Sequence, residues 1–326
     1  MATPQVVQSD TTSDTIPRHG GFGHLAFFYR DQRDYLTQLI AFVDAGLALG
    51  EPVFIAVPSP KDDLLREHLA GSGDLRFADM VQLGRNPARI MPEVRAFIDR
   101  HPGQCVRYIG EPIWAGRSAA EVCEATRHEA LINVAFPDAS AIIMCPYDVS
   151  GLAPSVISAA SRTHPGIFAD GRATAAAEYA GPGNFPPGCD GRLPCPPATA
   201  ETVEYENDLR PVRSLVTDHS ERAGLPDERA GNLVLAASEI AANTLRHSGG
   251  AGGTMHMWHT DAEVLCQIQD QGWISDPLAG RTRHAPDARG HGLWVVNQVC
   301  DLVELRTGKR GTTIRMHMSL PVRKRR

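Results

Sequence analysis

The sequence has no run of apolar residues near the roughly 18 that a membrane-spanning helix requires, and its first 21 residues do not have a secretory pattern. We therefore expect a cytoplasmic protein without a membrane segment. Seven cysteines are scattered without the paired spacing of a zinc site, which predicts reduced, mostly buried thiols. A net charge of -6 gives no reason to expect direct binding to nucleic acid.

What the chain does contain is enough ordinary globular sequence for two domains. It has 326 residues, 42% of them hydrophobic and 21% charged, so each half can bury a core of its own. Proline and glycine gather between residues 181 and 200, which predicts a semi-stiff linker. The predicted divisions are a disordered tail (1–20), an N-terminal domain (21–180), the linker (181–200), a C-terminal domain (201–320) and a basic tail (321–326).

The N-terminal half alternates short apolar runs with amphipathic stretches. The apolar runs predict strands at 25–29, 53–57, 106–109 and 141–145, and the amphipathic stretches predict helices at 34–49, 62–69, 87–99 and 119–135. This alternation is typical of an α/β domain with a mostly parallel sheet flanked by helices. Ligands of such sheets bind at the carboxyl ends of the strands. The polar residues that follow the predicted strands are Arg30, Ser59, Glu111 and Asp148.

This half contains neither a phosphate-binding Gly-rich loop with lysine nor a dinucleotide fingerprint. It resembles the MEDS sensory domain through the segments His24–Tyr29, Ile109–Pro112, Trp114, Gly116–Arg117, Glu129 with Asn133, Cys145–Asp148 and Thr163–Pro165. The resemblance implies a sensory or docking module, and the pattern does not identify its signal. His24, His128 and His164 could bind a metal, respond to pH, or be hydrogen-bonded core residues.

The C-terminal half is organised around a predicted helix from Glu228 to Ser248. Its apolar residues recur at helical spacing, so Glu239, Asn243 and His247 lie four residues apart on one stripe. Alone, such a polar stripe is more often a solvated face than a site. The elements that follow the helix change that interpretation.

Two alternating runs, 254–259 and 263–269, predict a hairpin that ends in Asp270 and Gly272. A polar segment follows, and then Gly290, His291, Gly292 and Leu293 open a second apolar helix. Gly311 and Thr312 finally lead a last strand over 314–318.

Each of these motifs has residues that could bind part of a nucleoside triphosphate or act on it. Asp270 can accept the amino group of adenine, and the glycines let the backbone approach the ring and the phosphates. Asn243 offers a neutral oxygen to Mg²⁺, and Glu239 can take a proton from an attacking hydroxyl.

In this order, the pieces resemble the GHKL ATP-binding domain, and most closely the anti-sigma factor serine kinases of the RsbW and SpoIIAB type. The matched positions are Glu239, Asn243, His247, Asp270, Gly272, Gly290, Gly292, Gly311 and Thr312. The resemblance implies an α+β sandwich. It also implies that these matched positions, together with His291 and Leu293, bind ATP and Mg²⁺ under a lid at 273–289. Trp273 and Ile274 depart from the glycine found there in many relatives, so the implied lid begins with two large side chains in this chain.

The function predicted from this resemblance is an ATP-dependent protein serine/threonine kinase that phosphorylates an anti-sigma factor antagonist and binds or releases a sigma factor, so that a sensed signal reaches transcription. A homodimer is also implied. Two alternatives stay open. A sensor histidine kinase would need a phosphorylatable histidine, of which His219 is a faint candidate, and a nucleotide-gated binding module would transfer no phosphate.

Overall fold

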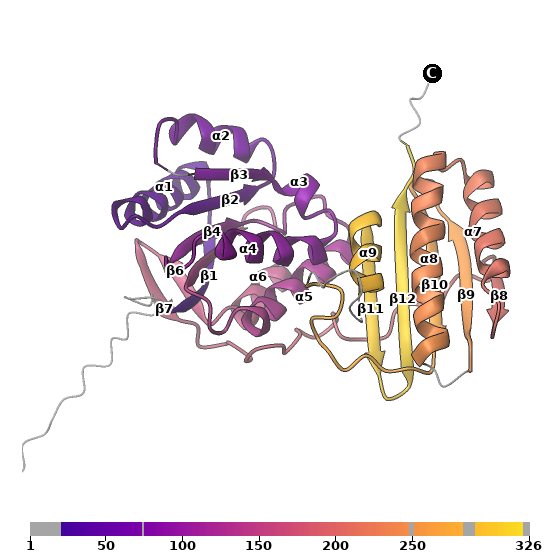
Figure 1. The fold of residues 1–326 in the computed structure, drawn as a ribbon. Helices are drawn as coiled ribbons and strands as arrows, with labels where there is room; N and C mark the ends of the chain where they lie inside the picture. Colours follow the sequence, from indigo (N-terminus) through magenta and orange to yellow (C-terminus); the bar gives the residue numbers. More distant parts are fainter. Residues whose placement is uncertain (1–20, 74, 248–250, 283–290, 322–326) are drawn as a thin grey trace, which may run out of the picture.

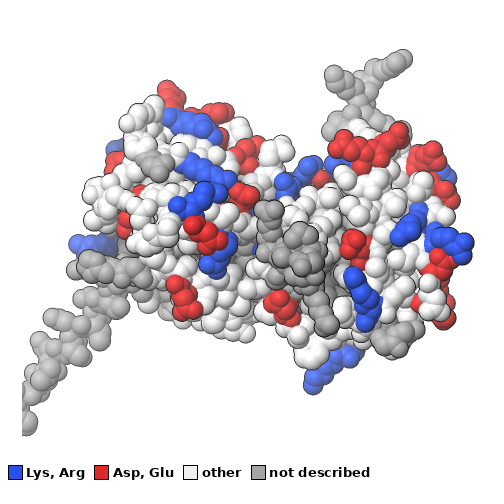
Figure 2. Space-filling view, in the orientation of Figure 1, with Lys and Arg blue, Asp and Glu red and all other residues white. Residues whose placement is uncertain are grey.

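The computed structural model describes residues 21–73, 75–247, 251–282 and 291–321, which form two domains side by side (Figure 1). The N-terminal domain is drawn in indigo to magenta and the C-terminal domain in orange to yellow. No helix in these ranges is long and apolar enough to cross a membrane. On the face shown in Figure 2, acidic and basic side chains are interspersed over both domains.

The N-terminal domain is built on a seven-stranded sheet of order β3-β2-β4-β5-β1-β6-β7. Every neighbouring pair is parallel except β6 and β7. Its strands are β1 (Phe22–Tyr29), β2 (Val53–Val57), β3 (Leu75–Asp79), β4 (Val106–Gly110), β5 (Ala141–Asp148), β6 (Gly166–Ala169) and β7 (Arg172–Ala175). Its helices are α1 (Gln32–Ala48), α2 (Lys61–His68), α3 (Met80–Leu83), η1 (Pro87–Arg89), α4 (Ile90–Asp99), α5 (Ala119–Ala135) and α6 (Pro154–Thr163).

Helices cover both faces of this sheet, and each face has its own hydrophobic core. One core packs α1 and α2 against the sheet through residues such as Leu39 and Leu65. The other packs α4, α5 and α6 through residues such as Val94, Leu131 and Ala160. β2 is buried at all five positions, as expected for a central parallel strand covered on both sides.

The C-terminal domain is a five-stranded antiparallel sheet with helices on one face. The sheet order is β11-β12-β10-β9-β8. Its strands are β8 (Glu201–Tyr205), β9 (Gly253–His259), β10 (Glu263–Asp270), β11 (Leu302–Gly308) and β12 (Gly311–Ser319). Its helices are α7 (Arg210–Ala223), α8 (Asp227–His247) and α9 (His291–Val299).

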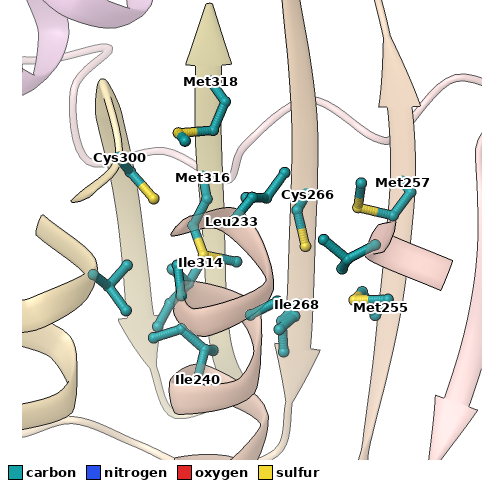
Figure 3. Close-up of a cluster of buried hydrophobic side chains, with 14 of the residues drawn as sticks. Leu233, Ile240, Met255, Met257, Cys266, Ile268, Cys300, Ile314, Met316 and Met318 are labelled. Carbon is teal, nitrogen blue, oxygen red and sulfur yellow. The ribbon is translucent and has the colours of Figure 1, made fainter. Parts of the chain in front are cut away.

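The core of the C-terminal domain lies between α8 and the sheet and is rich in sulfur (Figure 3). Leu233 and Ile240 of α8 lie over the strands. The sulfur-containing residues of this core are Met255, Met257, Cys266, Cys300, Met316 and Met318, each at most 1% exposed. This apolar stripe fixes which face of α8 is turned away from the sheet core, and the polar stripe predicted from the sequence lies beside it.

No helix or strand is present between Ala175 and Glu201. The second half of this segment runs along the C-terminal sheet. The guanidinium group of Arg315 donates to the carbonyl oxygen of Pro194, and Arg306 Nε donates to the carbonyl oxygen of Gly191 at 3.1 Å. The predicted linker is therefore irregular but bound to the C-terminal domain at these points.

Candidate functional site

The candidate site begins on α8, where Glu239 and Asn243 are half-buried one turn apart and His247 is exposed at the end of the helix. The predicted stripe is therefore present. Asn243 Oδ1 accepts a hydrogen bond from the guanidinium group of Arg246, so this oxygen already faces a cationic donor. Sequence reasoning missed Arg246 because an exposed arginine at a helix end is common.

Gly292, in the first turn of α9, brings the second glycine segment against α8. A Cβ at this position would lie 2.5 Å from Glu239 Oε2 and 3.4 Å from Asn243 Nδ2. The first of these distances is shorter than real Cβ contacts allow, so only glycine fits without displacing the glutamate. Residues 49 and 53 positions before Gly292 thus meet it at one point, as the order of the sequence motifs predicted.

The carboxylate of Asp270 is held from two sides at the end of β10. Its Oδ2 accepts from Thr244 Oγ1 of α8 at 2.7 Å, and its Oδ1 accepts from the backbone amide of Gly272 at 2.7 Å. Thr244 is a site residue that sequence reasoning missed. It is the neighbour of Asn243 in the chain, so this bond joins the strand end to the predicted metal-binding helix.

Gly311 and Thr312, at the start of β12, pack against the backbone of Asp270 and Gly272. Gly311 has φ of +111°, and a Cβ there would lie 2.1 Å from the carbonyl oxygen of Asp270, so the turn requires glycine. Thr312 Oγ1 donates to the carbonyl oxygen of Gly272 at 2.8 Å. Thr312 therefore fixes the backbone next to Asp270.

The start of α9 supplies backbone amides beside Glu239 and Asn243. The first N–H groups of a helix lack intrahelical partners and favour anions, and His291, Gly292 and Leu293 occupy these positions. The side chain of Leu293 itself is 5% exposed and belongs to the core, so only its backbone can face a phosphate. Gly290, the remaining predicted residue of the segment 290–293, lies outside the described residues.

The first part of the predicted lid, residues 273–282, lies between the two domains. The backbone amide of Ile274 donates to Thr307 Oγ1 at 2.9 Å, and Leu278 packs against a core of the N-terminal domain. Asn297 Nδ2 of α9 donates to the carbonyl oxygen of Gly280 at 3.0 Å. Its second part, 283–289, lies outside the described residues.

A cavity of about 860 Å³ adjoins this region. It is lined by the linker, by the turn between β11 and β12 and by residues near the end of β10. It touches Asp270 and Thr312 but neither Glu239 nor Asn243. The point where Gly292, Glu239 and Asn243 meet is therefore outside the lining of this cavity.

In the N-terminal domain, a separate polar cluster lies at the carboxyl edge of the sheet. The buried carboxylate of Glu111 accepts from Tyr29 Oη at 3.0 Å and from Tyr35 Oη at 3.3 Å, and Lys61 Nζ also donates to it. Burial raises the pKa of Glu111, and the bond to Lys61 opposes that change.

Of the four polar residues predicted at this edge, Glu111 is completely buried within that cluster. Arg30 and Ser59 are exposed, and Asp148 Oδ1 accepts from the backbone amide of Ser150 at 2.9 Å in a turn. The three histidines that were candidate metal ligands do not all lie together. His24 and His164 lie with their ring centroids 4.0 Å apart, whereas His128 is buried without belonging to the cluster formed by those two.

An antiparallel sheet covered by helices on one face, with an acid, an amide and glycine turns gathered at one end, defines a nucleotide-binding domain of the GHKL class. Residues 202–318 belong to the histidine kinase-like ATPase domain family, and residues 23–165 belong to the MEDS (MEthanogen/methylotroph, DcmR Sensory) domain family. Both assignments expected from the sequence are thereby confirmed.

No curated protein matches the chain. Among solved structures, the chain is similar to the histidine kinase AdeS of Acinetobacter baumannii, with 12% identity and a TM-score of 0.22. That match covers 36% of this chain and 67% of AdeS.

Proposed function

We propose that this protein is a regulatory serine/threonine kinase of the anti-sigma factor type, which binds ATP with Mg²⁺ and phosphorylates a hydroxyl of an anti-sigma factor antagonist. The proposal depends on one observation, the close approach of Gly292 to the side chains of Glu239 and Asn243. This contact places the N-terminus of α9 beside a carboxylate and an amide. The match of residues 202–318 to the histidine kinase-like ATPase domain supports ATP as the ligand.

The residues at this point fit ATP and Mg²⁺. Asn243 Oδ1 would bind the metal in place of its bond to Arg246, and the backbone amides at the start of α9 would bind the phosphates. Asp270 retains acceptor capacity beside its two bonds and would bind the adenine amino group. Mg²⁺, when bound, neutralises phosphate charge.

Glu239 is the residue that we assign as the general base. It lies one turn before Asn243 and against Gly292, so a hydroxyl that approached the phosphate end would meet its carboxylate. The hydroxyl would give its proton to this carboxylate as its oxygen bonded the γ-phosphorus of ATP. The bond from that phosphorus to the β–γ bridging oxygen would break, and ADP would leave. We propose no nucleophilic residue within the chain itself.

The alternative of a histidine kinase needs an accessible histidine, and His219 is poorly suited. Its side chain is 7% exposed, its Nδ1 is 2.6 Å from Glu201 Oε1, and its Nε2 is 3.2 Å from His259 Nδ1. With both ring nitrogens engaged, His219 lacks a free nucleophilic atom. This favours a hydroxyl on a partner as the acceptor.

The test separates nucleotide binding from phosphoryl transfer. We expect Asn243→Ala to abolish Mg²⁺-dependent ATP binding in calorimetry, because the metal loses its protein ligand. We expect Glu239→Gln to keep ATP affinity but to stop labelling of the partner. Glu228→Gln, on the exposed first turn of the same helix, is the matched control and should retain both.

The partner is identified by capture from native cytoplasm with and without ATP. An ATP-dependent complex with an antagonist or a sigma factor, and an acid-stable phosphate on the antagonist, would support the proposal. Acid-labile label on a response regulator would replace it with the histidine kinase. Tight ATP binding without label on any captured protein would leave the nucleotide-gated module.

A further inference from the structure

Inside the MEDS domain, four side chains of metal-binding types meet at one point. They are His24 of β1, Glu129 of α5, Cys145 of β5 and His164, the C-cap of α6. Their ligand atoms all lie within 4.8 Å of one another, and each residue is at most 1% exposed. The shortest separations are 3.0 Å from His24 Nε2 to Glu129 Oε2, 3.3 Å from His164 Nε2 and from Cys145 Sγ to the same oxygen, and 3.6 Å from Cys145 Sγ to His24 Nε2.

The hydrogen bonds around His24 determine which of its nitrogens carries the proton. Asn133 Nδ2 donates to the carbonyl oxygen of Thr163 at 2.8 Å, so its Oδ1 is the atom that faces His24 Nδ1 at 3.0 Å. An amide oxygen can only accept, and His24 Nδ1 must therefore donate. In a neutral imidazole whose proton is on Nδ1, the other nitrogen, Nε2, presents a lone pair to the cluster.

His164 is oriented in the same way. Its Nδ1 lies 2.9 Å from the carbonyl oxygen of Ala160, which also can only accept. Nδ1 of His164 therefore carries the proton, and Nε2 points its lone pair towards the cluster without a hydrogen-bond partner. Histidines that bind metals are held by just such a bond from the other ring nitrogen.

The cluster consequently has too few protons for its acceptors. Two imidazole lone pairs and a carboxylate converge, and the thiol of Cys145 can donate only one hydrogen. Glu129 Oε1 and His164 Nε2 have no hydrogen-bond partner although both are buried. A buried polar atom without a partner destabilises the fold, so this arrangement calls for a cation at its centre.

We propose that His24, Glu129, Cys145 and His164 bind one divalent transition-metal ion, with Zn²⁺ as the best match. Two imidazole nitrogens, one carboxylate and one thiolate suit zinc in a four-coordinate site, whereas Mg²⁺ and Ca²⁺ require oxygen ligands. On binding, the S–H bond of Cys145 breaks, its proton leaves to solvent, and Sγ bonds the metal. The charges of the ion, the thiolate and the carboxylate then sum to zero, as a buried site requires.

The position of the site indicates a structural role in the sensory domain. All four positions around the metal are taken by protein side chains that solvent does not reach, and a catalytic zinc site would keep one position open. The ligands join β1 and β5 to α5 and α6. Metal binding would therefore stabilise the packing of these two helices on the central strands.

The experiment uses the full chain, stripped with a chelator and titrated with Co²⁺ and then Zn²⁺. We expect one Co²⁺ per chain, visible d–d bands, a near-ultraviolet thiolate-to-cobalt band, and loss of all bands when Zn²⁺ displaces the cobalt. Metal should also raise the thermal unfolding midpoint. A wild-type chain that binds less than half an equivalent, or that binds cobalt without the thiolate band, would overturn the proposal.

Variants then assign the ligands. We expect Cys145→Ala to lose the thiolate band and His164→Ala to weaken Co²⁺ binding at least tenfold. Cys266→Ala, equally buried in the other domain, and Cys123→Ser, on α5 but outside the cluster, are the controls and should keep the band. Retention of the band in Cys145→Ala, or its loss in either control, would contradict the assignment. If Cys145→Ala did not fold, His164→Ala and the wild-type spectrum would still decide.

Discussion

At the scale of single residues, Gly292 tests the nucleotide site most directly. Because a Cβ there would lie 2.5 Å from Glu239 Oε2 and 3.4 Å from Asn243 Nδ2, Gly292→Ala places a methyl group at the start of α9, where the phosphates would bind. We expect ATP affinity to fall at least tenfold, which corresponds to about 1.4 kcal/mol. Titration with a fluorescent ATP analogue would measure it.

Gly231→Ala is the matched control for this change. Gly231 lies in α8, and a Cβ there would meet no atom within 4 Å. Replacing a helix-interior glycine by alanine stabilises a helix by about 0.5–1 kcal/mol, so this variant should melt slightly higher and bind ATP as the wild type does. Equal ATP affinity for both variants would remove Gly292 from the phosphate end.

The sequence predicted residues that the structure brings close together, but not all the bonds among them. Glu239, Asn243, Asp270, Gly292 and Thr312 lie together because their boxes have a fixed order, which can be recognised without coordinates. Thr244 and Arg246 were missed, since a threonine inside a helix and an arginine at its end carry no signal of their own.

The metal cluster could not be derived from sequence. Its ligands at 24, 129, 145 and 164 come from two strands, a helix and a helix end, so they share no local spacing. Only the parallel pairing that sets His24 of β1 beside Ile143, two residues before Cys145, brings two of them close. Of the predicted histidines, His128 did not join, although it is next to Glu129 in the chain, because neighbouring positions on a helix point in different directions.

At the scale of elements, three adjacent strands of the ATPase sheet are joined by one buried histidine. His317 of β12 lies between Glu263 of β10 and Glu304 of β11, with its Nδ1 and Nε2 each 3.0 Å from a carboxylate oxygen. Burial by itself lowers the pKa of His317, but the bonds to both carboxylates outweigh it and raise the pKa to about 9. The imidazolium form therefore links the three strands at neutral pH.

This link predicts a pH dependence of stability. A pKa that is higher in the folded than in the unfolded chain gives stabilisation that is complete below about 6.5 and is lost as pH rises through about 9. The change in pKa from 6.5 to about 9 corresponds to roughly 3 kcal/mol of stability. The urea midpoint should fall across this range in the wild type and stay flat in His317→Gln.

His256→Gln serves as the control for that series. Burial lowers the pKa of His256, so its titration affects stability only below about 6.5 and in the opposite direction. This variant should retain the alkaline loss of stability. A flat profile for the wild-type chain would show that the charged form of His317 does not stabilise the sheet.

Among the elements, those with a clear apolar or amphipathic pattern were predicted well, and those without such a pattern were not. The helix predicted at 119–135 and the strand predicted at 53–57 match α5 and β2 residue for residue, because capping by Ser118 and a continuous apolar run mark them. β3, α3, α6, β6 and β7 were not predicted. β3 is half-buried at every position and β7 is mostly exposed at the sheet edge, so neither has the apolar pattern of a covered strand.

At the scale of the whole molecule, the sensory domain contacts the parts of the ATPase domain that surround the nucleotide site. Asn86 Nδ2, just before η1, donates to the carbonyl oxygen of Asn297 at 3.1 Å and to its Oδ1 at 3.0 Å. Arg85 pairs with Asp301 at 2.8 Å, directly after α9. No local pattern indicated these contacts, since each partner lies more than 200 residues from the other along the chain.

Glu124 of α5 is the charged centre of this interface. Its side chain is 1% exposed, with Oε1 accepting from Arg306 Nη1 at 2.5 Å and Oε2 lying 3.4 Å from Arg281 Nη2. Arg281 belongs to the first part of the lid segment, and Arg306 belongs to β11. The helix that carries Glu129 of the proposed metal site thus also holds the lid segment and the sheet edge of the ATPase domain.

Glu124→Gln should release the lid segment without unfolding either domain. Removal of the charge takes the carboxylate partner from Arg281 and leaves Arg306 with Glu304 at 3.9 Å, and breaking a buried ion pair costs about 3–5 kcal/mol. We expect hydrogen exchange to accelerate in peptides covering 276–282 and 118–127, and ATP affinity to change with it. Glu93→Gln removes the exposed pair with Arg76, worth about 0–1 kcal/mol, and should leave both peptides unchanged. If exchange over 276–282 were the same in both variants, Glu124 would not restrain the lid segment, and a signal in the sensory domain would need another route to the nucleotide.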